Sequence, residues 1–276
     1  MAPHQQHGPS DPDGRIWPLQ QSDAFKEMFN VVIQLGAILA VVVLYWSKLW
    51  PFHRKRIPQR SWFAQQSTNG FVGGLQRFGD RYCCMDKIVM WLKIAVSCLP
   101  AMLIGLPLND WLDKHFYNPT VVALMLLLYG AGFLLVERYN HRRKPRVNSI
   151  AALRWSDALL IGVFQVLALI PGTSRSGATI LGGILIGASR EVAAEYTFFL
   201  AVPVMFGASL LKIVKFGTIS GTELGVLLVG MAVASACPSW PFASSWAISA
   251  STIFTAFGWY RIGLGLLVLL YFYVIR

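Results

Sequence analysis

Charged residues are scarce in this chain, and their scarcity excludes an ordinary soluble domain. Only 13% of the 276 residues are Asp, Glu, Lys or Arg, whereas 55% are hydrophobic. A soluble globular domain carries about 25% charged residues. The composition therefore predicts an integral membrane protein that forms one unit rather than a series of domains.

Cysteine and histidine are also few, and neither shows the spacing of a metal site. The four cysteines (Cys83, Cys84, Cys98 and Cys237) are expected to be unpaired thiols, and the five histidines form no HExxH motif. The first 21 residues lack a basic region followed by an apolar run, so we expect no signal peptide. The net charge of +11 lies in short loops between apolar segments, which argues against a nucleic-acid partner.

Long apolar runs are what the chain does contain. A spanning helix needs about 20 mainly apolar residues. Seven segments approach this length: Phe29–Trp46, Ile88–Leu106, Pro119–Val136, Ala158–Ile170, Tyr196–Val214, Glu223–Ala236 and Thr255–Ile275. The pattern predicts an all-α polytopic membrane protein with about seven spanning helices. Between Ile170 and Arg190, the run ATILGGILIGAS is too short to span and predicts a re-entrant hairpin.

The basic loops predict the orientation of these helices. Lys48 to Lys87 holds eight Lys or Arg residues and Arg138 to Arg154 holds six, whereas Leu108 to Asn118 has one base and two acids. Basic loops lie in the cytoplasm. We therefore expect residues 1–22 to form an atypical polar N-terminus. Residues 23–276 should form a single membrane domain, with cytoplasmic loops at 47–87 and 137–156.

The stretch PGTSRSGAT, from Pro171 to Thr179, places hydroxyls and an arginine after an apolar run, on the outer side by this orientation. Arg175 offers a planar fork of donors that suits phosphate oxygens, and an arginine within a membrane is costly unless it faces a cavity or a partner. Pro171 stops the preceding helix, and the next helix would direct its first N–H groups at the same place. The stretch predicts an anion site, most simply for phosphate. The alternative is a polar helix break in which Arg175 pairs with an acid.

The run from Ile170 to Ala208, which begins IPGTSRSGATILGGILIGASRE, closely resembles the signature of the bacterial undecaprenyl pyrophosphate phosphatase (bacitracin-resistance) family. FNVVIQLGAILAVVVLYW and WYRIGLGLLVLLYF resemble that family's second segment and last helix. The resemblance covers roughly Ala24–Phe52, Trp91–Ala234 and Phe254–Phe272.

This resemblance implies a membrane enzyme with an inverted-repeat fold and re-entrant hairpins. It would hydrolyse undecaprenyl diphosphate to undecaprenyl phosphate and phosphate, recycle the lipid carrier for cell-wall synthesis and confer bacitracin resistance. It implies a divalent cation (Mg²⁺ or Ca²⁺), a bacterial plasma-membrane location and an active site that opens outward. By resemblance, Arg175, Ser174 and Ser176 are catalytic, while Gly172, Thr173, Gly177 and Thr179 form the substrate site. Whether a serine or water attacks is left open.

Three further polar residues are candidates for binding substrate. Gln34 and Gln165 lie within apolar segments, and an interhelical hydrogen bond is the alternative role of each. Arg261 should lie near the outer end of the last helix and could hold phosphate. Its alternative role is to extend its charge to the membrane interface.

The chain departs from the family in one important respect. The family carries two glutamates four residues apart, then a Pro-x-Ser-Ser-Thr-Gly-His run, and residues 1–22 contain neither. Glu191 and Glu195 have that spacing but follow the hairpin, so Glu195 is only a candidate metal ligand. Weak resemblance at 1–22, 53–86 and 236–253 suggests frame changes in the coding sequence, which re-reading the nucleotides in other frames would test.

These departures leave two other functions open. Re-entrant hairpins also occur in transporters, so a polyprenyl-phosphate transporter or flippase is one alternative. An inactive, truncated family member is the other. We expect the lipid bilayer and a polyprenyl diphosphate as partners, and a homo-oligomer is an open alternative to a monomer.

Overall fold

The computed structural model describes residues 22–52, 84–116, 118–140, 143–236 and 250–275. Within these ranges the chain is mostly helical and contains no strand, and an isolated β-bridge pairs Val147 with Ala188. The all-α prediction is thus confirmed. The frame changes suggested for 1–22, 53–86 and 236–253 fall almost entirely outside the described residues.

The helices follow the apolar segments closely. The long ones are α1 (Asp23–Leu44), α4 (Met85–Phe116), α5 (Pro119–Asn140), α8 (Arg190–Phe216) and α11 (Ala250–Leu270, continued by the π-helical turn η4, Tyr271–Ile275). Shorter ones are α2 (Trp46–Leu49), α6 (Trp155–Val166), α7 (Arg175–Ile186) and α9 (Gly221–Ala236), with 3₁₀ turns η1 (Ile150–Ala152) and η2 (Leu167–Leu169). All seven predicted segments are helical.

Five of these helices are long and apolar enough to cross a membrane: α1, α4, α5, α8 and α11. The prediction of about seven spanning helices also counted α6 and α9, which have 12 and 16 residues in the described part of the chain and are apolar but shorter than the other five. At 1.5 Å per residue, α6 extends about 18 Å, well short of a hydrocarbon core of about 30 Å. The segment between Leu108 and Asn118 was also predicted as a loop, yet α4 continues through it to Phe116.

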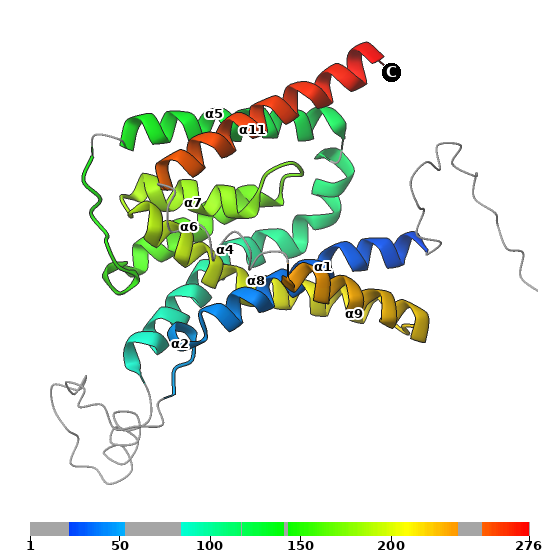
Figure 1. Ribbon diagram of the computed structural model, residues 1–276, viewed down its shortest axis with the longest axis horizontal. Helices are drawn as coiled ribbons and strands as arrows, with labels where there is room; N and C mark the ends of the chain where they lie inside the picture. Colours follow the sequence, from blue (N-terminus) through cyan, green and yellow to red (C-terminus); the bar gives the residue numbers. More distant parts are fainter. Residues whose placement is uncertain (1–21, 53–83, 117, 141–142, 237–249, 276) are drawn as a thin grey trace, which may run out of the picture.

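A helix pair and a group of three helices flank a central group (Figure 1). Helices α5 and α11 run side by side on one flank, α1 packs against α8 and α9 on the other, and α6, α7 and part of α4 lie between. Glycine allows close approach on both flanks. Between α5 and α11, a Cβ on Gly130 would lie 2.8 Å from the Gly258 carbonyl, and between α1 and α9, one on Gly36 would lie 2.5 Å from the Met231 carbonyl. Small residues at such contacts are typical of membrane helices.

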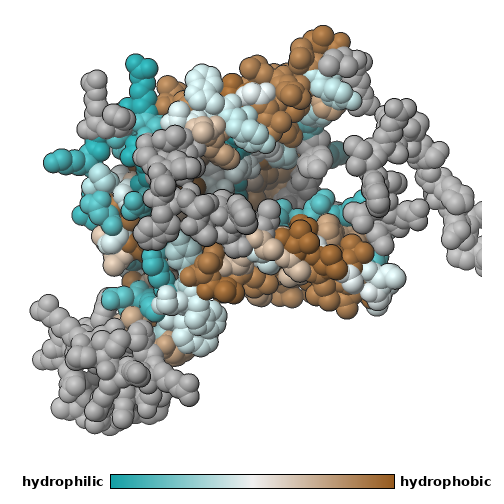
Figure 2. Space-filling model, in the orientation of Figure 1, coloured by the Kyte–Doolittle hydropathy of each residue, from teal (hydrophilic) through white to brown (hydrophobic). Residues whose placement is uncertain are grey.

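The surface is divided between polar and apolar regions. Figure 2 shows hydrophilic side chains on the side that carries the 143–154 loop, and hydrophobic side chains over the far ends of α11 and α9. Many large apolar side chains are exposed, including Leu103 (70%), Val214 (69%) and Leu228 (57%). Apolar exposure on this scale fits helices that face lipid, so the chain is a multi-pass membrane protein.

Candidate functional site: an anion cradle at the start of α7

The PGTSRSGAT stretch forms the tip of a helical hairpin. Helix α6 leads through η2 to a turn at 170–174, and α7 then runs back beside α6 (Figure 1). The far ends of both arms meet at Arg146, whose Nη2 donates to Asp157 Oδ1 of α6 (2.7 Å) and to the Ile186 carbonyl of α7 (3.3 Å). A helical hairpin of two short arms is therefore present, with α6 as its first arm, as a re-entrant hairpin requires.

Gly172 gives the turn its shape. Its φ is +87°, in the left-handed region that strains other residues. A Cβ at this position would also lie 2.7 Å from the backbone of Val122 in the first turn of α5. The turn thus packs directly on α5, and only glycine fits there.

Ser174 begins α7 as its N-cap. Its Oγ accepts a hydrogen bond from the Gly177 N–H (3.2 Å) and lies 3.1 Å from Ser176 Oγ. The first N–H groups of a helix have no partner within it, and the helix dipole is positive at this end. A site that favours an anion is therefore formed by Ser174, Ser176 and the start of α7. We call this site, together with Arg175, the anion cradle.

Arg175 is the first residue of α7, and it has no acidic partner in the described part of the chain. The ion pairs found there are Lys48–Glu195, Arg146–Asp157 and Arg190–Glu137. Cys98 of α4 lies near the guanidinium. The alternative in which Arg175 pairs with an acid is therefore wrong for the described residues, and this partly buried cation remains available to a ligand.

Arg261 of α11 supports the same turn from behind. Its Nη2 donates to the Gly172 carbonyl at 2.6 Å, its side chain lies beside Gly177, and only 4% of the residue is exposed. The interface role was therefore wrong. Arg261 also lies midway along α11, opposite Tyr129, rather than near the outer end, because α11 and η4 continue to a Tyr273–Thr120 hydrogen bond (3.0 Å).

The remaining predicted residues are placed less directly. Thr179 is 1% exposed, and its hydroxyl donates a hydrogen bond to the Arg175 carbonyl (3.0 Å). The same hydroxyl accepts a hydrogen bond from Thr197 of α8 (3.0 Å), so Thr179 braces the first turn of α7. Thr173, half-buried, lies in the turn beside Tyr129. Gln165 is 3% exposed, and its Oε1 has no hydrogen-bond partner among the described residues. Gln34 is exposed and bonds within α1, to the Asn30 carbonyl (3.1 Å), so the interhelical hydrogen bond is not observed for it.

A divalent cation is not accommodated by the described residues alone. No three His, Cys, Asp or Glu side chains gather anywhere among them. Glu195, the candidate ligand, instead pairs with Lys48 Nζ at 2.5 Å. Mg²⁺ and Ca²⁺ prefer carboxylate oxygens, whereas Ser174 and Ser176 offer hydroxyl groups at the turn. Glu195 was suggested by its spacing from Glu191, and that spacing reflects the start of α8.

Comparison with known proteins places this cradle in a family context. The chain matches the family described as Bacitracin resistance protein BacA over residues 14–267. It is 50% identical over 257 residues to an undecaprenyl-diphosphatase of Acetivibrio thermocellus, a match that covers 92% of this chain and 86% of the relative. It is 47% identical over 253 residues to an undecaprenyl-diphosphatase of Enterococcus faecalis, covering 91% of this chain and 84% of the relative.

Proposed function

Because the chain belongs to the bacitracin resistance protein BacA family, we propose that it hydrolyses undecaprenyl diphosphate to undecaprenyl phosphate and phosphate. The observation that carries this function is the Arg175 guanidinium, held at the start of α7 with no acidic partner among the described residues. The relatives carry the name of a phosphatase, so transport is the less favoured alternative. The chemistry recycles the lipid carrier for cell-wall synthesis and underlies bacitracin resistance.

The geometry supports a specific division of labour in the reaction. The Arg175 fork binds non-bridging oxygens of the diphosphate, where negative charge accumulates as the terminal phosphate leaves. The start of α7 and the hydroxyls of Ser174 and Ser176 add donors to the same oxygens. Such preorganised donors stabilise the transition state more than the ground state. The attacking group is water or a hydroxyl, and no described carboxylate or imidazole is hydrogen-bonded to Ser174 or Ser176 to act as their base.

We further propose that the protein lies in the bacterial plasma membrane with the cradle facing outward. Both arms of the hairpin end at Arg146, within the basic loop that the charge distribution assigns to the cytoplasm. The arms are each about 18 Å long, so their tip lies well into the membrane from that side. The first basic loop lies at this end of the hairpin as well, because its Lys48 pairs with Glu195 near the start of α8. The homo-oligomer and the divalent cation remain predictions.

Phosphate release from undecaprenyl diphosphate by the full chain in detergent tests the function directly. We expect Arg175→Ala to lower kcat at least 100-fold, because removing one hydrogen-bond donor to the transition state typically lowers kcat by about this factor. Arg143→Ala is the matched control, because Arg143 is exposed and stacks on Tyr139 (4.0 Å). Assays with Mg²⁺, with Ca²⁺ and with EDTA test the cation.

The same assay separates the alternatives. Binding of the diphosphate without release of phosphate would favour a transporter. A folded chain that neither binds nor hydrolyses it would be an inactive family member. Bacitracin resistance on overexpression gives an independent readout in cells.

A further inference from the structure

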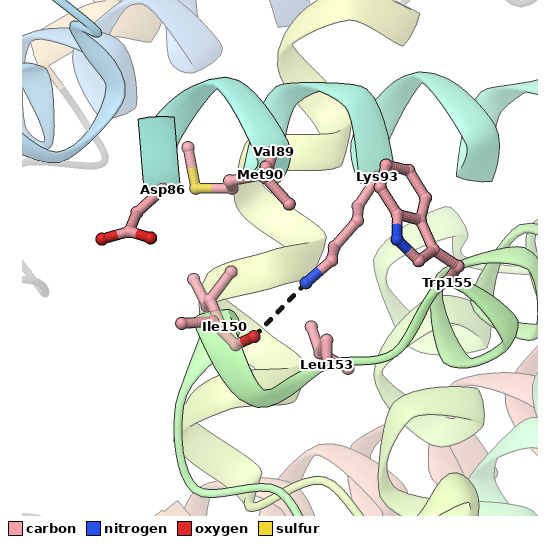
Figure 3. Close-up of a pocket in the computed structure, with 8 residues that line it drawn as sticks. Asp86, Val89, Met90, Lys93, Ile150, Leu153 and Trp155 are labelled. Carbon is pink, nitrogen blue, oxygen red and sulfur yellow. Dashed lines mark hydrogen bonds between the residues drawn. The ribbon is translucent and has the colours of Figure 1, made fainter. Parts of the chain in front are cut away.

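A second polar site lies at the other end of the hairpin from Arg175. A cavity of about 200 Å³ opens between α4, η1 and the start of α6 (Figure 3). Its walls are mostly apolar (Val89, Met90, Ile150, Ala151, Leu153 and Trp155), and its charged residues are Lys93 and Asp86. None of these residues belongs to the anion cradle, so this cavity has a chemistry of its own.

Lys93 is the unusual member of this cavity. Only 5% of the residue is exposed, and its Nζ donates one long hydrogen bond, of 3.3 Å, to the Ala151 carbonyl. An ammonium group has three donors, and a buried charge is costly unless it is paired. Asp157 lies near but is already bonded to Arg146 and to the Arg154 N–H. The described residues therefore leave Lys93 with donors that a bound anion would satisfy.

Asp86 supplies the opposite charge at the mouth of the cavity. It is exposed and lies seven residues before Lys93, hence two turns away on the same face of α4. Long side chains on a helix lean towards its N-terminus, which directs the Lys93 ammonium along the cavity towards Asp86. Figure 3 shows the Lys93 side chain reaching between α4 and η1, with Asp86 near one end of the cavity and Trp155 near the other.

The surroundings place the cavity at the level of lipid headgroups. Trp155 begins α6 and is 49% exposed, and tryptophan in this position marks the membrane–water interface. Leu92 and Leu159, on the same two helices, are 52% and 45% exposed, as expected of lipid-facing side chains. Basic pockets between helices on the cytoplasmic side are known to hold lipid headgroups. Here the pocket also carries an acid, so a ligand with both charges fits better than a purely anionic one.

We propose that this cavity binds an amine-bearing phospholipid of the phosphatidylethanolamine type, with its phosphate on Lys93 and its ammonium on Asp86. The apolar walls contact the upper acyl chains. The bound lipid would also brace the hairpin through α4. Ser97, one turn after Lys93, donates a hydrogen bond to the Ala158 carbonyl of α6 (2.6 Å), and its Oγ lies 2.7 Å from the Tyr196 hydroxyl of α8, with which it shares a hydrogen bond.

Thermal unfolding of the delipidated full chain in detergent tests this site. Phosphatidylethanolamine should raise the Tm more than phosphatidylglycerol does, and inorganic phosphate should not raise it. Lys93→Met should weaken the apparent affinity for phosphatidylethanolamine about tenfold or more, since it removes a charged hydrogen bond. Asp86→Asn should abolish the preference over phosphatidylglycerol. Lys144→Met is the control, because Lys144 is an exposed lysine at the same end of the hairpin. It should leave unchanged both the affinity for phosphatidylethanolamine and the preference over phosphatidylglycerol.

Each contrary outcome overturns the proposal. Equal shifts with the two lipids would show that the amine is not recognised, and an equal shift with inorganic phosphate would show an anion site with no lipid specificity. Unaltered binding by Lys93→Met would place the lipid elsewhere. If Lys93→Met fails to fold, Asp86→Asn and the comparison of lipids on the unmodified chain still decide, because Asp86 is exposed.

Discussion

The Nη2 of Arg261 donates to the Gly172 carbonyl at 2.6 Å, across 89 residues of sequence. This bond fixes the turn that carries Ser174 and Arg175 to a helix at the other end of the chain. The guanidinium is buried between the turn and the rings of Tyr129 and Phe257, 5.9 and 5.5 Å from their centroids. Its Nε has no partner in the described structure. Arg261 therefore acts first on the position of the turn, with donor capacity left for a ligand.

Arg261→Lys should separate positioning from charge. Lysine keeps the charge but cannot reproduce the planar fork, so the Gly172 carbonyl loses a well-aligned donor. We expect kcat/KM to fall about tenfold or more, with kcat affected more than KM, because a misplaced turn misaligns the donors of α7. The Tm should change little, and kinetics together with thermal unfolding measure both. A loss of Tm in proportion to the loss of activity would make Arg261 a purely structural residue.

Gly172→Ala should disable the turn itself. The alanine would have to adopt a φ of +87° and would bring its Cβ to 2.7 Å from the Val122 backbone. Strain of this kind costs about 1–3 kcal/mol, and the clash adds to it. We expect a lower Tm and a loss of phosphatase activity. Gly207→Ala is the matched control, since a Cβ there meets nothing within 4 Å, and it should leave both readouts near those of the parent.

The sequence predicted the helices and the local shape of the PGTSRSGAT turn, and it failed where contacts are set by distant segments. The PGTSRSGAT stretch carries its own turn glycine, cap and arginine, so its local geometry follows from nine residues. Apolar length identified the long helices but missed the continuation of α4 to Phe116. It also could not show that α6 turns back with α7, which depends on Arg146 joining their far ends. The sequence did not predict the contact of Arg261 with the Gly172 carbonyl, because an apolar helix pattern does not identify the partner of an arginine within it. Lys93 was missed entirely, since its cavity exists only once η1 packs on α4.

The two ion pairs of α8 should contribute differently to the free energy of unfolding. Arg190 holds Glu137 through two hydrogen bonds, of 2.9 and 2.5 Å, and the Glu137 side chain is 10% exposed. Glu137→Gln leaves a largely buried arginine without its counter-charge, and we expect a loss of about 3 kcal/mol in the free energy of unfolding. Glu195→Gln breaks the Lys48 pair, whose lysine is 57% exposed, so about 1 kcal/mol or less should be lost.

Glu195→Gln also tests the candidate metal ligand. If Glu195 serves only the pair with Lys48, phosphate release and its response to Mg²⁺ should be unchanged. Loss of the Mg²⁺ response in a variant of normal Tm would instead assign the carboxylate to the cation and contradict the arrangement seen here. A titration of activity against Mg²⁺, run on both glutamate variants, makes the comparison.

Thiol labelling in intact cells should settle which way the cradle faces. The background is a chain whose four cysteines are replaced, carrying either Lys114→Cys at the end of α4 or Arg143→Cys in the second basic loop; both positions are exposed. The basic loops are expected in the cytoplasm, so a membrane-impermeant maleimide should label Lys114→Cys in intact cells and Arg143→Cys only after lysis. Because Arg146 ties both arms of the hairpin to the Arg143 side, this result would direct the tip with Arg175 outward. The reverse pattern would turn the cradle towards the cytoplasm, and a polyprenyl diphosphate would then have to be hydrolysed on the inner leaflet.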